Sequence, residues 1–197
     1  MSLLSARRRR QSAGYTMVEL MMSLALFTVG VLGVISMQKI TIVSNAHAKN
    51  LAVAQRIMQT WASQLQMDSS AWRTTFDSSG VLATPSGVWE RPTYKTGRVG
   101  AAFDALGSPL NESSLGQARF CVHTRLSWLY NSAGVSNNGV VRAEIRVFWQ
   151  RDGQAVLDPT KGLCGTQDAD QVKAIGQAVT NYHFIYQTVA IRQRAQI

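Results

Sequence analysis

The sequence predicts an α+β fold in which one long helix lies across an antiparallel sheet of three or four strands. An uncharged apolar run covers residues 20–38, and an amphipathic stripe continues from it to residue 68. Later segments alternate between apolar and polar side chains. Steps of three and four residues are typical of a helix with one buried face, and steps of two are typical of a half-buried strand.

The apolar run is long enough for a helix to cross a bilayer at a rise of about 1.5 Å per residue. Four arginines at residues 7–10 precede it. They predict that the N-terminus stays in the cytoplasm, because moving this charge through hydrocarbon is costly. Glu19 stands at the start of the run, where an ionisable side chain costs about 3 kcal/mol on insertion scales. A carboxylate at this depth therefore needs a partner.

The place of the small-residue cleavage site separates this N-terminus from an ordinary secretory signal. An ordinary signal is cleaved after its apolar region, which is then discarded. Here Gly14 precedes the apolar region, and no comparable site follows Met37. Cleavage after Gly14 would leave a chain that begins at Tyr15 and keeps its membrane helix.

The order of basic leader, glycine, aromatic residue, glutamate and apolar span resembles the class III signal of type IV prepilins and pseudopilins. The resemblance implies that prepilin peptidase cleaves between Gly14 and Tyr15 and methylates the new amino group of Tyr15, although most relatives have Phe there. It implies that Glu19 pairs with the N-terminal amine of a neighbouring subunit and sets axial register in a filament. Residues 29–38, with Gly30 and Gly33, resemble the matching stretch of PilV-like minor pilins.

The pilin-like fold implied by this resemblance has four segments: a cleaved leader at 1–14, a membrane-spanning or filament-core half of the helix at 15–37, an amphipathic half at 38–68, and a globular head at 69–197. The expected stripe of the amphipathic half consists of His47, Leu51, Ala54, Met58, Trp61 and Leu65. We expect the larger apolar members to pack on the sheet and His47 to be a tolerated interfacial residue.

The head begins with an irregular stretch and ends in strands. Residues 71–118 are rich in glycine and proline and predict loops, with regular structure expected only at 88–94 and 99–103. Residues 120–128 and 141–149 each alternate and are joined by a Gly- and Asn-rich stretch, which predicts an antiparallel hairpin. Residues 181–191, rich in Tyr, Phe, Ile and Val, predict a third strand.

The two cysteines, Cys121 and Cys164, both fall in the part expected to lie outside the cytoplasm. A cysteine pair without Cys-x-x-Cys spacing in an exported domain predicts a disulfide rather than a metal or redox site. Closing a loop of about 44 residues contributes about 4 kcal/mol in the chain-entropy model. The C-terminal region is therefore expected to be tied to the sheet.

No catalytic set emerges from the sequence. The three histidines, which fall on different predicted elements, are His47, His123 and His183. No nucleophile elbow, phosphate-binding loop or zinc-protease motif is present. Asp168 and Asp170 are candidate caps of a short helix predicted at 170–179, and two carboxylates are too few for a calcium site. We expect no cofactor, no metal and no enzymatic activity.

The first interpretation of function is a structural minor pilin needed for type IV pilus assembly, in an initiation or tip complex, with adhesion or motility as its context. The resemblance implies these partners: other major and minor pilin subunits, prepilin peptidase, and an inner-membrane assembly platform. The protein would first span the inner membrane once with its head in the periplasm, and later reside in a pilus at the cell surface. A pseudopilin of type II secretion is the nearest alternative.

A second alternative is a DNA-binding pilin for DNA uptake, since basic groups bind phosphate without sequence specificity. The residues that favour it are Arg192 and Arg194 near the C-terminus and, on the hairpin, Arg125, Arg142 and Arg146. However, the formal charge falls from +9 to +5 once the four leader arginines are removed. We therefore favour a solvated sheet face, and nucleic acid is not expected as a partner.

Overall fold

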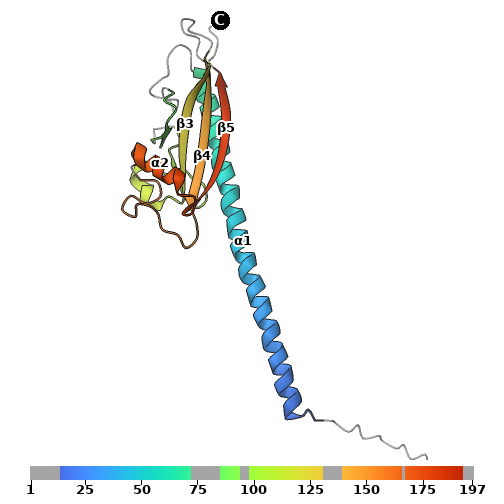
Figure 1. The fold of residues 1–197 in the computed structure, drawn as a ribbon. Helices are drawn as coiled ribbons and strands as arrows, with labels where there is room; N and C mark the ends of the chain where they lie inside the picture. The colour runs from blue at the N-terminus through green and yellow to red at the C-terminus, as the bar shows by residue number, and fades with distance from the viewer. Residues whose placement is uncertain (1–13, 72–84, 94–97, 131–138, 166, 193–197) are drawn as a thin grey trace, which may run out of the picture. The chain divides into compact units, whose positions relative to one another are not determined.

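The computed structural model describes residues 14–71, 85–93, 98–130, 139–165 and 167–192. The leader arginines and Arg194 lie outside these residues. The elements in order are α1 (Met17–Ala71), β1 (Trp89–Glu90), β2 (Ala102–Phe103), the 3₁₀ helix η1 (Glu112–Gln117), β3 (Phe120–Tyr130), β4 (Val140–Gln150), α2 (Ala169–Gln177) and β5 (Tyr182–Arg192) (Figure 1). The chain divides into two compact units, Met1–His47 and Ala48–Ile197. From here on, the head means the second unit, which includes the C-terminal part of α1 in addition to the residues 69–197 expected from the sequence.

In the first unit, α1 exposes apolar side chains on all sides. Four of its hydroxyl groups do not need water, because each donates a hydrogen bond of 2.8–2.9 Å to a carbonyl of the same helix. These residues are Ser23, Thr28, Ser36 and Thr41. Polar groups in a lipid environment must be satisfied internally. By length and composition, α1 is the one helix in the described part of the chain that could cross a membrane.

In the head, the C-terminal part of α1 has one buried face. The buried apolar residues of this face are Ala54, Ile57, Met58, Trp61, Ala62 and Leu65. The predicted stripe is therefore largely confirmed, with Leu51 half-buried and His47, at the end of the first unit, exposed. The helix continues to Ala71 rather than ending near Asp68. Buried Asp68 forms an ion pair with Arg98, and such a partner cannot be read from sequence spacing.

The sheet is antiparallel throughout and has the order β1-β3-β4-β5, with β2 also paired to β3. The predicted α+β architecture is confirmed, and the hairpin and third strand are present as β3, β4 and β5. The sheet has five strands instead of three or four. The two additional strands have two residues each and fall within the segments 88–94 and 99–103. A strand of two residues is too short to show the alternation of apolar and polar side chains by which strands are predicted.

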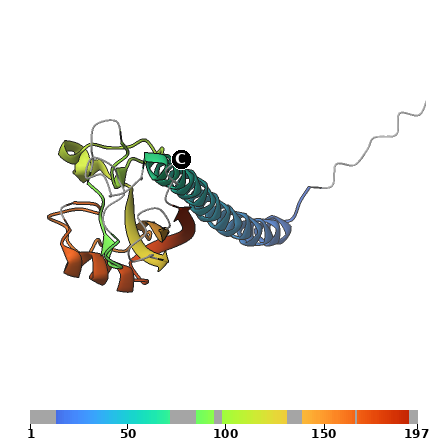
Figure 2. The same ribbon diagram turned by 90° about the horizontal axis from the view of Figure 1, so that it is seen from above.

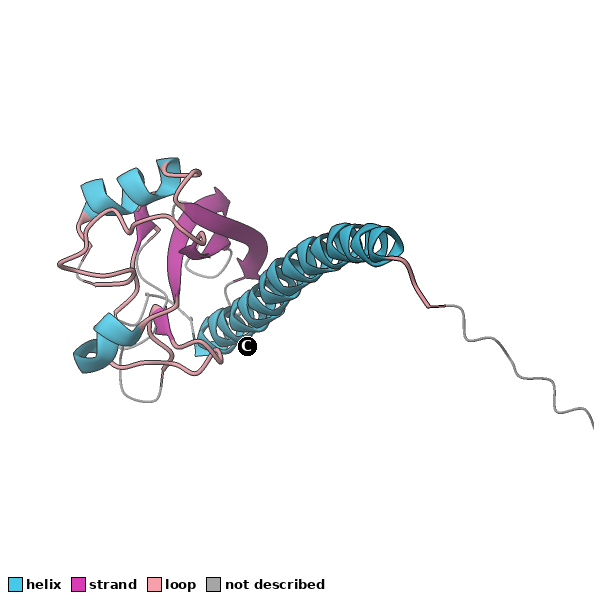
Figure 3. Cartoon of the chain, turned by 90° about the horizontal axis from the view of Figure 1, so that it is seen from below, coloured by secondary structure: helices cyan, strands magenta, loops and turns pink. Residues whose placement is uncertain are grey.

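The two faces of the sheet are covered by different elements. The head part of α1 packs on one face, and α2 with the disulfide-bearing loop covers part of the other (Figures 2 and 3). On β3, Phe120 and Val122 belong to the α1 side, and Cys121 belongs to the α2 side. Trp128, which continues the apolar alternation, is 37% exposed near the end of its strand.

Two short helices surround the second face. Asp168 is the N-cap of α2 and forms a capping box with Gln171. The structure therefore selects Asp168 over Asp170 as the cap. The 3₁₀ helix η1 is absent from the sequence-based prediction, which assigned its residues to loops. It is held by the ion pair of Glu112 with Arg91 at 2.9 Å, a contact 21 residues apart in sequence.

Candidate functional site

The processing residues predicted from the sequence lie directly before α1. Gly14 and Tyr15 are exposed, and Tyr15 retains 85% of its accessible surface. Apart from its chain neighbours, no atom of the described residues lies within 4 Å of a Cβ placed on Gly14. Gly14 and Tyr15 are thus open to another protein.

Glu19 takes part in a capping box at the start of α1. The backbone amide and the hydroxyl of Thr16 each lie 3.3 Å from Glu19 Oε2 and donate to it. In return, the Glu19 amide donates to Thr16 Oγ1, also at 3.3 Å. Thr16 precedes the first helical residue, and Glu19 is the third, which is the spacing of this motif. The carboxylate therefore stabilises its own helix end, and it remains exposed to further donors.

Packing within the described residues does not explain why residues 30 and 33 are glycines rather than larger residues. A Cβ on either would meet nothing within 4 Å. Glycine costs about 1 kcal/mol relative to alanine in a helix interior. Close approach of another helix is the circumstance in which membrane helices gain from such residues.

A family model described as the prokaryotic N-terminal methylation motif matches residues 9–35. The match includes the predicted cleavage position, Glu19 and most of the apolar run. Residues 9–35 therefore carry a prepilin-type N-terminal methylation motif. This confirms the resemblance for the N-terminal motif. No curated protein and no solved structure matches the chain.

The motif indicates the class of protein. Proteins with a prepilin-type N-terminal motif are structural subunits and not enzymes. The N-terminal apolar helix is the element by which such a protein is anchored in the inner membrane. No group of three or more potential metal ligands occurs among the residues the structure describes.

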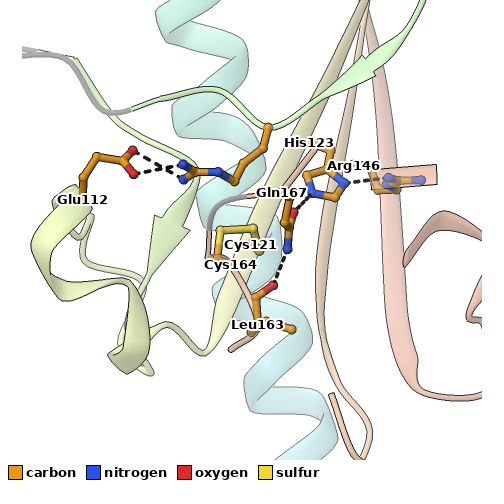
Figure 4. Close-up of a disulfide and its surroundings, with 8 residues drawn as sticks. Glu112, Cys121, His123, Arg146, Leu163, Cys164 and Gln167 are labelled. Atoms are coloured by element: carbon orange, nitrogen blue, oxygen red, sulfur yellow. Dashed lines mark hydrogen bonds and ion pairs between the residues drawn. A yellow bond between two sulfur atoms is a disulfide. The ribbon is translucent and has the colours of Figure 1, made fainter. Parts of the chain in front are cut away.

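The head of this prepilin-type protein is crossed by a disulfide between Cys121 on β3 and Cys164 in the loop before α2 (Figure 4). The Cα atoms are 5.4 Å apart, and both residues are fully buried. The bond joins residues 43 apart in sequence and holds the loop that leads to Gln167 against the sheet.

A partly buried chain of polar side chains, which we call the polar chain, runs beside the disulfide (Figure 4). Gln167 Nε2 donates to the Leu163 carbonyl at 2.9 Å, and Gln167 Oε1 lies 2.7 Å from His123 Nε2. His123 Nδ1 lies 2.6 Å from Arg146 Nη2. Because a guanidinium can only donate, His123 Nδ1 is the acceptor and the proton resides on Nε2. In each of these three hydrogen bonds, a donor therefore faces an acceptor.

Arg146 connects the polar chain to α2. Its Nη2 donates to the Val172 carbonyl at 3.0 Å, and its guanidinium lies over the rings of Trp89 and Phe184 at 4.6 and 5.8 Å. A Cβ on Gly176 would stand 2.3 Å from Arg146 Nη1. Glycine in the interior of α2 is therefore explained by the close approach of the helix to this side chain.

The other sequence-predicted residues are distributed over the fold. Arg125 pairs with Glu144 at 2.5 Å, and Arg142 lies 3.8 Å from the same carboxylate. The hydrogen bond from Arg125 is the main cause that lowers the pKa of Glu144. Arg192 is exposed at the end of β5.

The expectation that all hairpin arginines lie on a solvated sheet face is wrong for Arg146, which is 4% exposed. The three histidines remain on separate elements, α1, β3 and β5. His123 and Arg146 are the functional candidates that the sequence interpretation missed. They oppose each other in the hairpin register, which is the signal that could have identified them.

The polar chain makes a prediction about acid stability. Burial, with a smaller contribution from the Arg146 charge, lowers the pKa of His123 from 6.5 to about 3. The unfolded chain therefore binds a proton between these values that the folded head does not bind. The free energy of unfolding should fall as pH drops below 6.5, by up to about 1.4 kcal/mol per unit. Urea unfolding of the full chain in detergent at pH 4.5 to 7.5 measures this slope.

His123→Gln is the control for that measurement, because it removes the titrating group while the remaining carboxylates stay. The difference in slope between the native chain and His123→Gln belongs to His123 alone. Equal slopes below pH 6.5 would show that His123 is not held neutral by burial.

The disulfide makes a second prediction. The mature protein taken from cells should contain no free thiol when it is alkylated under denaturing conditions, because both cysteines are joined. After reduction, the mass should increase by two alkyl groups. Two labelled cysteines before reduction would contradict the bond.

Proposed function

We propose that the protein is a minor pilin required for type IV pilus assembly, acting in an initiation or tip complex. The single observation that carries this proposal is the N-terminal methylation motif at residues 9–35. The exposed apolar helix and the disulfide-tied head are the two parts that such a subunit needs. One part enters a filament core or membrane, and the other lies outside it.

The proposed maturation removes residues 1–14 and leaves Tyr15 as the methylated N-terminus. The openness of the backbone around Gly14 supports access by prepilin peptidase. Until then the chain spans the inner membrane once, with the leader arginines in the cytoplasm and the head in the periplasm. Extraction by an inner-membrane assembly platform then brings it among other major and minor pilin subunits.

We assign Glu19 the role of setting register against the N-terminal amine of a neighbouring subunit. Its capping box uses Oε2, and the residue remains exposed at the helix start. A neighbouring ammonium group would compensate a carboxylate that lipid cannot solvate. The glycine pair at 30 and 33 would allow helices of adjacent subunits to approach closely.

The hairpin arginines give little support to a DNA-binding pilin. Two hairpin arginines share Glu144, and the third is buried beneath α2. These side chains therefore do not present the row of free cations that phosphate binding needs.

The test is deletion of the gene in its native cell, with surface pili and secreted enzymes scored in parallel. Loss of pili with normal secretion, restored by the intact gene, is expected. Loss of secretion with normal piliation would contradict the proposal and indicate a pseudopilin of type II secretion. Complementation with a gene that encodes Glu19→Ala is the matched control. It should restore the level of the protein without restoring pili.

A further inference from the structure

Arg146 carries a buried positive charge whose partners in the structure are neutral. They are the imidazole of His123, the carbonyl of Val172, the hydroxyl of Tyr186 and the aromatic rings of Trp89 and Phe184. The Nε–H group is buried and has no hydrogen-bond partner among the described residues. Isolating a charge from water costs several kcal/mol unless an opposite charge approaches it.

The chain itself offers Arg146 no carboxylate in the described residues. Glu144, two positions earlier on β4, bonds to Arg125 instead. No ion pair of Arg146 occurs in the parts that the structure describes. Outside them, the sequence contains one acidic side chain, Asp77.

A groove of about 470 Å³ lies between α2 and the segment of β1, and Arg146 lines it. The other charged residues of the lining are Lys173 and Asp170, both exposed on α2. Trp89 forms part of the wall and Gly176 removes a side chain where α2 approaches Arg146. The lining therefore combines two cations, one anion and an aromatic surface, with a net charge of about +1.

We propose that this groove binds the carboxylate of an acidic side chain on a partner protein, with Arg146 supplying the buried charge. A monoanion neutralises the net charge of the lining, whereas a phosphate dianion would be repelled by Asp170. The aromatic wall at Trp89 accommodates the apolar neighbours of that side chain. Lys173 adds a second attraction at the helix surface. The inference concerns the head alone and holds for a pilin or a pseudopilin.

The experiment titrates the full ¹⁵N-labelled chain in detergent with a defined peptide, acetyl-Leu-Glu-Leu-Gly-amide. The same peptide with Gln in place of Glu is its neutral control. The observed signals are the Arg146 Nε–H and the Trp89 indole N–H. We expect saturable shifts of both with the Glu peptide and none with the Gln peptide at the same concentration. Raising the salt concentration should weaken binding.

Two surface variants change the charge of the groove without disturbing buried residues. Lys173→Gln should weaken binding of the Glu peptide by about threefold, and Asp170→Asn should strengthen it by a similar factor. Lys49→Gln, an exposed lysine on α1 that does not line the groove, should leave the affinity unchanged. The opposite signs at two neighbouring positions exclude a general loss of folding.

Arg146→Met tests the buried charge directly, with the dispersion of the amide spectrum as the measure of folding. A folded Arg146→Met chain should lose binding. If it does not fold, the opposed effects of Lys173→Gln and Asp170→Asn decide the proposal. Equal shifts with the Gln peptide, no shift with either peptide up to millimolar concentration, or unchanged affinity in both surface variants would overturn it. Saturation by sodium acetate at the same concentration would also overturn it. The groove would then bind any free carboxylate, and the neighbouring residues of a partner protein would add nothing.

Discussion

Trp61→Ala is expected to lower the free energy of unfolding of the head by about 3–5 kcal/mol. Trp61 is fully buried in the cluster formed by α1 and the sheet, together with Ile57 and Leu65. Truncation to alanine removes one of the two tryptophan side chains of that cluster and leaves a cavity between helix and sheet. The melting temperature of the full chain in detergent should fall by roughly 10 °C.

Trp61→Phe is the matched control. It keeps an aromatic ring and removes the indole N–H, which is buried and has no hydrogen-bond partner in the described structure. We expect it to cost less than half as much as alanine, because an unsatisfied donor disappears along with the lost volume. Near-UV circular dichroism during urea unfolding measures both variants. A cost below 1 kcal/mol for Trp61→Ala would show that this helix face does not pack on the sheet.

Glu19→Gln is expected to abolish or sharply reduce incorporation into a filament while insertion into the membrane stays normal. Glutamine can keep the capping box with Thr16, because its side-chain oxygen still accepts the Thr16 amide. It cannot attract a neighbouring ammonium group as a carboxylate does. Glu19→Ala should have the same effect on incorporation and in addition lose the cap. Immunoblots of sheared pili against membrane fractions measure both outcomes.

Thr16→Val tests the capping role of Glu19 separately from the role of its charge. It removes the hydroxyl of the capping box and leaves the carboxylate in place. If the charge of Glu19 sets register, Thr16→Val should enter filaments at a level near that of the native chain. Normal incorporation of Glu19→Gln together with a failure of Thr16→Val would mean that the residue acts only as a helix cap.

The long elements of this fold could be predicted from the sequence because each repeats a pattern over many residues. The helix of 55 residues and the three strands of 11 residues provide enough periods to be recognised. The N-terminal signal was equally clear, since glycine, glutamate and apolar span must occur in order. The two-residue strands and η1 could not be predicted, because they exist only through pairing with β3 and the contact of Arg91 with Glu112.

The polar chain of the head illustrates a different limit. Alternation places His123 and Arg146 on the face opposite Val122 and Ile145, and such a face is usually solvated. Here α2 covers part of it, and that coverage follows from the disulfide at Cys164 and the close approach at Gly176. Periodicity reports which face a residue occupies, and it does not report what later segments place over that face.

The central claim is that the mature protein begins at Tyr15 with a methylated amine and retains its apolar helix. Mass spectrometry of the N-terminal peptide, from protein isolated from native cells, tests this most directly. The account predicts a peptide that starts with N-methyltyrosine followed by Thr16, and that changes to the uncleaved leader when prepilin peptidase is deleted. A mature N-terminus at another residue, or an unmethylated Tyr15 in assembled filaments, would contradict it.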